Sequence, residues 1–299
     1  MRTESLSGGS ARRRRAGLWV LLALVCAGCA DPPAPAAQPR TASAVAPDTV
    51  EFASGPLMLR GLVYRPAGPG PHPAVLFLHG SGDDYQAQVA EVGPLYARNG
   101  YLLFVPFRRG QGLSAGRGEA ISARLERELQ ANGREARMRL MAELLSTEQM
   151  DDVRAGLHFL ARLSGVDSTR MAVAGNSFGG ILSVFSAARA PGIRAAVASA
   201  PAALTWARAP ELRELLRTAA RESRVPIYFF QAENDRDLSP TRELAAEMER
   251  AGRPHVLKIY PPFGSTVEQG HSFGYFGGAT YGPDVFAFLA QHLGPAGSR

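Results

Sequence analysis

Six short apolar runs, separated by longer amphipathic stretches, constrain most strongly what this chain can fold into. The runs are AVLFLHG, YLLFVPF, RMAVAGN, IRAAVASA, VPIYFFQA and HVLKIYP, and each has the length of one buried strand. Stretches with helical spacing separate most of them, at 85–98, 148–163, 178–190 and 240–252, and another follows at 284–293. Apolar strands that alternate with helices predict a mostly parallel central sheet with helices on both faces, which places the chain in the α/β class.

Residues 50–299 are predicted to form one domain. Two further strands, at 50–54 and 57–66, are expected to pair around Gly55-Pro56 before the first apolar run. The sequence after residue 50 shows no internal repeat and no second boundary, and it is long enough for a single core. In a parallel sheet, sites collect at the carboxyl ends of the strands, so we expect functional residues directly after the apolar runs.

Residues 1–29 resemble a bacterial lipoprotein signal peptide. Four arginines at 12–15 precede an apolar run at 16–27 that is short for a membrane span. Small residues stand directly before Cys29, as in a lipobox, although Cys26 occupies a position where Leu is usual. The resemblance implies a lipid on Cys29, export, and a membrane anchor in the cell envelope, at the outer membrane if the cell has one. An ordinary secretory signal, which would release the protein, is the alternative.

Composition excludes several classes of site. Residues 30–49 are rich in Pro and Ala without an apolar period, which predicts a disordered tether. The net charge is +6, but residues 1–29 hold five Arg and one Glu, so 28 basic and 26 acidic residues remain. So small an excess argues against nucleic-acid binding. Both cysteines precede the predicted domain, and no His, Asp or Glu cluster has ligand spacing, so we expect no disulfide, metal or cofactor.

The pattern Gly175-Asn176-Ser177-Phe178-Gly179 is the first candidate for chemistry. It directly follows an apolar run and precedes small and apolar residues at helical spacing. The glycines permit a strained strand-to-helix corner that exposes the serine hydroxyl, and the start of the helix offers backbone N–H groups to an anion. A Gly-rich turn without chemistry is the alternative, but the strand–turn–helix context favours a nucleophile at Ser177.

A serine nucleophile needs a base and a third group that orients this base. Among the six histidines, His271 is the best candidate because it lies in a Gly-rich loop, GSTVEQGHSFGYFGG, after the last apolar run. The acid is expected between Ser177 and His271, after the run VPIYFFQA, where Glu233, Asp235 and Asp237 are candidates. The following turn favours Asp235, whereas Asp237 is suited to cap the next helix.

Attack on a carbonyl carbon also needs donors for the negative oxygen that forms. The segment LFLHGSGDD, at 76–84, ends a predicted strand. In this segment, Ser81 or Gly82 can direct a backbone N–H to the point that the N–H of Phe178 also faces. We predict a structural role for His79, because it precedes the serine in the chain and His271 is available as the base.

These motifs resemble those of the α/β-hydrolase superfamily, and within it those of the dienelactone hydrolases and their serine-esterase relatives. The resemblance is carried by HGSG at 79–82, GNSFGG at 175–180, QAENDRDLSP at 231–240 and YPPFGSTVEQGHSFG at 260–274, and it covers 55–293. It implies an α/β-hydrolase fold, a Ser177-Asp235-His271 triad, and Ser81 and Phe178 as oxyanion donors. True dienelactone hydrolases use Cys where this chain has Ser177, which indicates ordinary esters rather than lactones.

We therefore expect a serine hydrolase that cleaves small-molecule carboxylic esters through an acyl-enzyme intermediate. The alternatives are a serine exopeptidase of the prolyl-oligopeptidase type, a lactone hydrolase, and a non-enzymatic binding lipoprotein. Against the exopeptidase, the sequence before residue 50 is too short for a propeller, and no acidic pair for a substrate amino terminus is evident. Against the binding protein, no member of the triad is missing.

Residues 114–146 exceed what a crossover from a strand to the next helix needs. Two short helices that meet near Asn132-Gly133 are predicted, and six residues are available for an apolar face: Leu125, Leu129, Met138, Met141, Leu144 and Leu145. Insertions at the carboxyl ends of strands lie over the site, so we predict a lid whose methionines line an acyl pocket. A solvated hairpin held by charge pairs is the alternative, and specificity would then lie in the 203–223 segment around Trp206.

Overall fold

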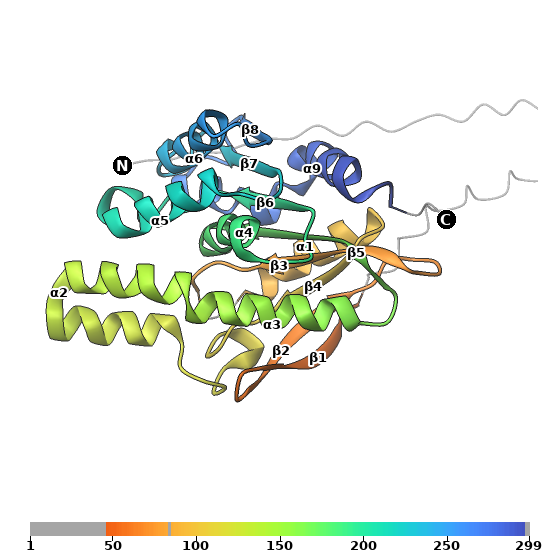
Figure 1. The fold of residues 1–299 in the computed structure, drawn as a ribbon, viewed down its shortest axis with the longest axis horizontal. Coiled ribbons are helices and arrows are strands. Elements are labelled where there is room, and N and C mark those ends of the chain that lie inside the picture. Colours follow the sequence, from red (N-terminus) through yellow and green to blue (C-terminus); the bar gives the residue numbers. More distant parts are fainter. Residues whose placement is uncertain (1–45, 83–84, 297–299) are drawn as a thin grey trace, which may run out of the picture. The chain divides into compact units, whose positions relative to one another are not determined.

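Eight strands form one sheet in the computed structural model, which describes residues 46–82 and 85–296 (Figure 1). They are β1 (Asp48–Ser54), β2 (Leu57–Tyr64), β3 (His72–Leu78), β4 (Leu102–Pro106), β5 (Val166–Asn176), β6 (Ala195–Ser199), β7 (Ile227–Ala232) and β8 (His255–Tyr260). Their order is β1-β2-β4-β3-β5-β6-β7-β8, and β2 runs opposite to the other strands. The predicted mostly parallel sheet is confirmed.

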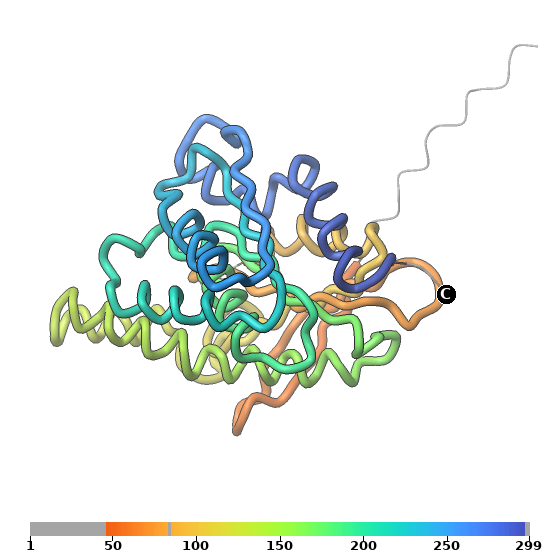
Figure 2. The backbone as a smooth tube through the Cα atoms, turned by 45° about the horizontal axis from the view of Figure 1, so that its top comes forward, coloured from red at the N-terminus to blue at the C-terminus, as the bar shows by residue number. Residues whose placement is uncertain are grey.

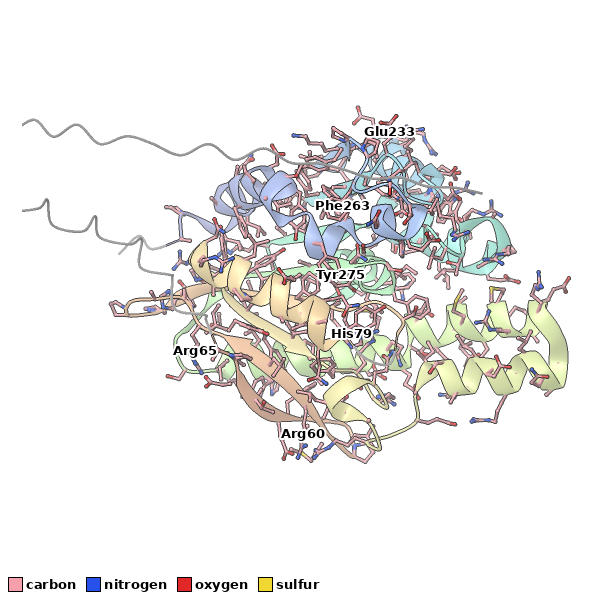
Figure 3. All side chains as sticks on the ribbon, turned by 180° about the vertical axis from the view of Figure 1, so that it is seen from behind. Arg60, Arg65, His79, Glu233, Phe263 and Tyr275 are labelled. Carbon is pink, nitrogen blue, oxygen red and sulfur yellow. The ribbon has the colours of Figure 1, made fainter. Side chains whose placement is uncertain are left out.

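Helices cover both faces of this sheet. One face packs against α3 (Glu148–Arg162), α4 (Phe178–Arg189), α5 (Pro210–Arg221) and α6 (Ser239–Arg250). The other face, seen from its own side in Figure 3, packs against α1 (Gln86–Arg98), α8 (Phe273–Phe276) and α9 (Gly278–Leu293). Successive side chains of β3 enter opposite cores, with Leu76 and Leu78 in one and Val75 and Phe77 in the other. Burial on both faces explains why the strands are almost continuously apolar.

The direction in which the sheet grows reverses at β3. The chain passes from β3 through α1 to β4 on one side, and then through α3 to β5 on the other side of β3. At such a switch point the two loops that leave the carboxyl ends diverge and leave a crevice between them. The segments that follow β3 and β5 contain Ser81 and Ser177, so the topology brings two of the predicted site residues to one place.

The predicted insertion consists of η1 (Gly112–Ser114) and the long helix α2 (Ile121–Ser146). Gly133, with φ 83° and ψ −176°, divides α2 into two arms at the predicted hinge, and glycine adopts such a positive φ without a steric cost. Five of the six predicted apolar residues are buried, and Leu129 is partly buried. The arms lie alongside α5, as Figure 2 shows, and their apolar side chains join the main core.

The described residues begin within the predicted tether. The lipoprotein leader and residues 30–45 of the predicted tether lie outside the described residues. The tether was predicted to reach residue 49, but β1 begins at Asp48, which pairs with Val63 of β2.

The helix α5 was not predicted, although Pro210 stands in its first turn. Within residues 46–82 and 85–296, none of the helices combines the length and hydrophobicity that crossing a membrane requires.

Candidate active site

Ser177 occupies a sharp corner between β5 and α4. Its φ of 59° and ψ of −114° are unusual for a residue with a side chain, and its N–H donates a hydrogen bond to the Ser199 carbonyl oxygen at 3.0 Å. The flanking glycines make the corner possible. A Cβ at Gly179 would collide with the Leu78 carbonyl oxygen, and a Cβ at Gly175 would lie 2.5 Å from the Gly179 backbone. The strained strand-to-helix turn that the pattern predicts is therefore present.

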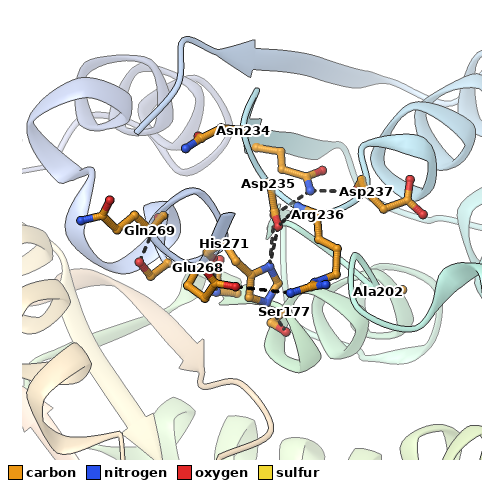
Figure 4. Close-up of polar contacts among 12 residues, drawn as sticks. Ser177, Ala202, Asn234, Asp235, Arg236, Asp237, Glu268, Gln269 and His271 are labelled. Atoms are coloured by element: carbon orange, nitrogen blue, oxygen red, sulfur yellow. Dashed lines mark hydrogen bonds and ion pairs between the residues drawn. The ribbon is translucent and has the colours of Figure 1, made fainter. Parts of the chain in front are cut away.

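The side chains of Ser177, His271 and Asp235 form one hydrogen-bonded line (Figure 4). The Ser177 Oγ lies 3.0 Å from His271 Nε2, and His271 Nδ1 lies 2.9 and 3.1 Å from the two oxygens of Asp235. With its proton on Nδ1, the imidazole donates to the carboxylate and keeps Nε2 available to accept the serine proton. The Asp235 side chain is fully buried, whereas His271 remains partly accessible. This arrangement can activate a hydroxyl nucleophile.

The other two candidate acids face elsewhere. The Asp237 Oδ1 accepts a hydrogen bond from the Ser239 N–H at 2.8 Å, where α6 begins, and Figure 4 shows its side chain apart from the imidazole. Glu233 is exposed at the periphery of the molecule (Figure 3). The structure thus brings Asp235 to His271, and Asp237 has the local contact at the helix start that its position predicts.

His271 is the last residue of the short helix α7 (Val267–His271), and not part of an irregular loop as predicted. The Gln269 N–H donates to the Thr266 side chain at 3.2 Å, while the Gln269 Oε1 accepts from the Thr266 N–H. This reciprocal capping box starts the helix. The spacing of Thr266 and Gln269 is its sequence signature, so the helix was predictable despite the surrounding glycines. The Asn176 side chain also donates to the His271 carbonyl oxygen at 3.3 Å.

Two buried residues that the sequence analysis missed hold the acid in place. Gln231, the penultimate residue of β7, donates to the Asp235 Oδ2 at 2.7 Å and to the Asp237 carbonyl oxygen at 2.9 Å. The Gln231 Oε1 accepts a hydrogen bond from the Thr241 hydroxyl at 2.6 Å. The Arg236 N–H donates to the other carboxylate oxygen at 2.6 Å. These bonds fix the orientation of the Asp235 carboxylate and, through it, that of the imidazole.

The segment 79–82 is held by two side chains from the chain that follows β4. Arg108 donates to the carbonyl oxygens of His79 and Gly80, at 2.9 and 2.6 Å, and Gln111 donates to those of Ser81 and Gly82, at 3.3 and 2.8 Å. All four carbonyl groups are therefore engaged by the same two residues. Arg108 is completely buried, and this burial lowers its pKa to about 10, so it stays charged at neutral pH.

The backbone N–H groups of the same segment have different partners. The Gly80 N–H donates to the Tyr275 hydroxyl at 2.8 Å, and the Gly82 N–H donates to the Tyr85 hydroxyl at 3.0 Å. Neither the Ser81 N–H nor the Phe178 N–H has an acceptor among residues 46–82 and 85–296. Of the two predicted alternatives, the Gly82 N–H is engaged, whereas the Ser81 N–H has no acceptor among the described residues, which favours Ser81 as the donor.

The side chain of His79 contacts the backbone of the segment to which it belongs, and among the described residues it forms no hydrogen bond with Ser177. Its Nδ1 is 3.0 Å from the Gly80 carbonyl oxygen, and its ring lies near the rings of Tyr85 and Phe107. Burial, together with the charge of Arg108, holds the pKa of His79 well below its ordinary value. The imidazole, labelled in Figure 3, is consequently neutral at physiological pH.

A cavity of about 300 Å³ opens onto Ser177. Ser81 and Phe178 line it beside the serine, and the insertion supplies Ile121, Leu125 and Met141 to its walls. The insertion thus lies over the serine, where the lid was predicted. A smaller adjoining hollow of about 170 Å³ is lined by Leu129 and Met138 among others.

The 203–223 segment contributes residues to the wall of the cavity, but Trp206 is not one of them. Trp206 is buried and donates from its indole to the Glu243 carboxylate at 3.1 Å, whereas Leu204, Thr205 and Arg208 line the cavity.

In the part of the chain that the structure describes, no three His, Cys, Asp or Glu side chains are grouped as metal ligands.

Comparison with known proteins places these observations in a family. The model of the dienelactone hydrolase family matches residues 59–277. Among solved structures, an esterase from Pyrococcus furiosus is 15% identical with a TM-score of 0.60, and the match covers 83% of this chain and 91% of the esterase. The acylaminoacyl peptidase of Pyrococcus horikoshii is also 15% identical with a TM-score of 0.60, over 83% of this chain and 42% of the peptidase.

A third similar structure is dipeptidyl peptidase 4 of Porphyromonas gingivalis, which is 19% identical with a TM-score of 0.59. The match covers 83% of this chain and 35% of that peptidase. This chain therefore spans about two fifths of the length of the matched peptidases, or less, and nearly all of the matched esterase. At these identities the structures share a fold with this chain, and that fold is the predicted α/β-hydrolase fold.

Proposed function

The chain belongs to the dienelactone hydrolase family and is a serine hydrolase in the general sense, and from this premise we propose that it is a carboxylesterase with Ser177 as its nucleophile. The observation that carries the proposal is the line from Ser177 Oγ through His271 to Asp235, with both bonds at hydrogen-bonding distance. Such a line converts a weakly nucleophilic hydroxyl into one that can attack a carbonyl carbon.

The proposed reaction has two halves. In the first, His271 Nε2 takes the Ser177 proton while Oγ bonds to the carbonyl carbon, and the N–H groups of Ser81 and Phe178 stabilise the negative oxygen. His271 then gives the proton to the departing alcohol, which leaves an acyl group on Ser177. In the second half, His271 removes a proton from water, the resulting hydroxide attacks the acyl carbon, and the proton returns to Ser177 as the carboxylic acid departs.

The cavity walls favour an ester over a peptide as substrate. An exopeptidase has to hold the charged amino terminus of its substrate, and carboxylates are the groups that do so. None of the described residues that line the cavity is an Asp or Glu, and the cationic side chains of Arg137 and Arg208 are present instead. The serine at position 177, where dienelactone hydrolases use cysteine, supports ordinary esters over lactones.

Ser177→Ala tests the proposal directly. Hydrolysis of p-nitrophenyl acetate and butyrate should fall by about a thousandfold or more, because the variant keeps the pocket but has no nucleophile. Ser146→Ala, which changes an exposed serine at the end of α2, is the matched control and should keep full activity. Unchanged thermal unfolding of both variants would show that the fold is intact.

Two further measurements separate the alternatives. A fluorophosphonate probe should label the wild type at Ser177 and should not label Ser177→Ala. Aminoacyl p-nitroanilides should be cleaved far more slowly than the esters. Preferential cleavage of the anilides would assign an exopeptidase instead, and a wild type that takes no label and cleaves neither substrate would indicate a binding protein.

A further inference from the structure

Two arginines line the wall of the cavity that opens onto Ser177. Arg137 comes from the second arm of α2, and Arg208 comes from η2 (Trp206–Arg208). The rest of the wall is largely apolar, with Leu125, Met141 and Ile181 among its members. The described lining residues include no carboxylate that could pair with these positive charges. Arg208 is exposed and Arg137 is half-buried, so the partly desolvated Arg137 is the one that gains most from a partner of opposite charge.

Three other arginines of α2 are paired with a carboxylate, whereas exposed Arg134 has no ion pair among the described residues. Arg124 contacts Glu148 at 2.9 Å, Arg127 contacts Glu119, and Arg139 lies 4.0 Å from Glu135. Arg137 forms no hydrogen bond or ion pair with any residue in 46–82 or 85–296. Its Nε–H is buried and has no acceptor, which is rare for a guanidinium donor in a folded protein.

The positive charge extends beyond the main cavity. Arg134, Arg137 and Arg208 all line the adjoining hollow, whose remaining walls are Leu129, Met138 and Thr205. Arg208 donates to the Leu204 carbonyl oxygen at 2.9 Å and has no carboxylate partner among the described residues. Arg137 and Arg208 therefore line both hollows, and Arg134 adds a third positive charge to the wall of the smaller one. A planar anion such as a carboxylate matches the paired donors of arginine.

The walls also indicate which half of an ester faces these arginines. In the proposed reaction, the departing alcohol must receive a proton from His271, so the alcohol has to lie on the imidazole side of Ser177. The cavity is lined by the two oxyanion donors Ser81 and Phe178, and His271 is not among its described lining residues. This arrangement favours the cavity as the place of the acyl group, and Arg137 and Arg208 are part of its wall.

We propose that the preferred substrates are esters whose acyl group ends in a carboxylate, with Arg137 and Arg208 as its binding residues. The apolar walls of Leu125 and Met141 would hold the methylene stem between the ester carbonyl and the carboxylate. This inference rests on the proposed esterase function and names its substrate class. It assigns to the insertion a role in recognising charge as well as in covering the site.

The test compares each anionic substrate with a neutral partner of the same size. The substrates are mono-p-nitrophenyl esters of adipic, pimelic and suberic acid, each paired with the corresponding ω-amide. At the best chain length, kcat/KM for the acid should exceed that for the amide by about tenfold or more, since charge-assisted bonds are stronger than neutral ones. The ratio should fall as salt is added, because salt screens accessible charges.

Substitutions test whether Arg137 and Arg208 cause the preference for the acids over the amides. Arg137→Met and Arg208→Met should each bring the ratio of acid to amide toward one, and Arg137→Lys should retain part of the preference because the charge remains. Arg139→Met is the matched control on the same helix, since Arg139 is paired with Glu135 and lines neither hollow. It should leave the ratio unchanged. Thermal unfolding of each variant shows whether the fold persists.

The failures of the two proposals are distinguishable. If the wild type hydrolyses the amides and the acids equally well at every length, the esterase function stands and the carboxylate proposal is overturned. A preference for the acids that survives both arginine substitutions would overturn the assignment of Arg137 and Arg208. A wild type that hydrolyses none of these esters would overturn the esterase function itself.

Discussion

Asp235 and Asp237 stand two residues apart, and their surroundings give them different tasks. Asp235 accepts from His271, Gln231 and the Arg236 N–H, whereas Asp237 accepts from the Ser239 N–H. Asp235→Asn should therefore lower kcat by about ten-thousandfold, since the amide cannot hold the imidazole in the required tautomer. Asp237→Asn should keep activity within a few fold, because Asn can still accept from the same N–H. Initial rates on p-nitrophenyl butyrate measure both.

A larger loss in Asp237→Asn than in Asp235→Asn would move the acid to Asp237. The comparison is well matched, because both variants remove one negative charge and leave the side-chain size unchanged.

At the residue scale, the residues of the candidate triad could be predicted from the sequence, and the residues that hold them in place could not. Ser177, His271 and Asp235 were predictable, because a nucleophile, a base and an acid must occur at strand ends in a known chain order. Gln231 and Arg108 were not predictable in this way. Their polar groups face partners brought together only by folding, such as the Asp235 carboxylate and the carbonyl groups of His79 and Gly80. A buried polar side chain of this kind has no local signature.

At the element scale, the segment after β4 sets the conformation of the segment after β3. Gln111 is buried, and its amide nitrogen donates to the carbonyl oxygens of Ser81 and Gly82. Gln111→Glu keeps the shape but replaces this donor by an oxygen that repels both carbonyl groups. We expect kcat to fall about tenfold or more with little change in KM, because a displaced Ser81 N–H stabilises the transition state less well.

Gln130→Glu is the control for this prediction. Gln130 lies on the exposed side of α2, where its amide donates to Glu126, and the same chemical change there should leave kcat unchanged. Binding of a trifluoromethyl ketone, which resembles the tetrahedral intermediate, should weaken in Gln111→Glu in parallel with kcat. Equal losses in kcat for both variants would show that the effect is one of charge alone and not of the segment.

The two methionines of the insertion permit a second test at this scale. Met141 lines the main cavity, whereas Met138 lines the adjoining hollow, and both are buried. Each substitution by Ala should lower the free energy of unfolding by about 2–5 kcal/mol. Met141→Ala should in addition shift the preferred acyl chain toward greater length, because it enlarges the cavity beside Ser177. Kinetics with p-nitrophenyl esters from acetate to decanoate would measure the shift.

Met138→Ala serves as the companion variant, with a similar stability loss and a smaller change in chain-length preference. An unchanged profile in Met141→Ala would make the insertion a cover without a part in acyl selection.

The elements themselves were unequally predictable. Strands buried on both faces produce apolar runs that a sequence shows plainly, and every predicted strand is present. The helix α5 was missed although its apolar residues recur at helical spacing, at Leu212, Leu215, Leu216, Ala219 and Ala220, so its amphipathic pattern was readable from the sequence. The helix α7 was missed because glycines on both sides favour a loop, and only the capping box of Thr266 and Gln269 opposes them.

At the scale of the whole molecule, sheet order decides where the chemistry occurs. Because β3 lies between β4 and β5, the segments that contain Ser81 and Ser177 leave adjacent strands at the same edge. The alternation of strands and helices predicts the parallel sheet, but it does not state this order. The order depends on which strands pair, and a mostly parallel sheet was predicted from the sequence without its strand order. The site was therefore predictable as a set of residues, and its distances were not.

The last prediction concerns how the whole molecule is held in the cell. We propose that Cys29 is lipidated and that the segment between Cys29 and β1 connects the domain to a membrane. Metabolic labelling with a radioactive fatty acid should mark the protein, and Cys29→Ala should abolish the label. Cys26→Ala is the matched control, because it removes the neighbouring cysteine and should retain the label. A salt wash weakens electrostatic attachment but not an anchor buried in lipid, so labelled protein should stay with the membrane fraction. Unlabelled protein in the medium would instead indicate an ordinary secretory signal that releases the protein from the cell.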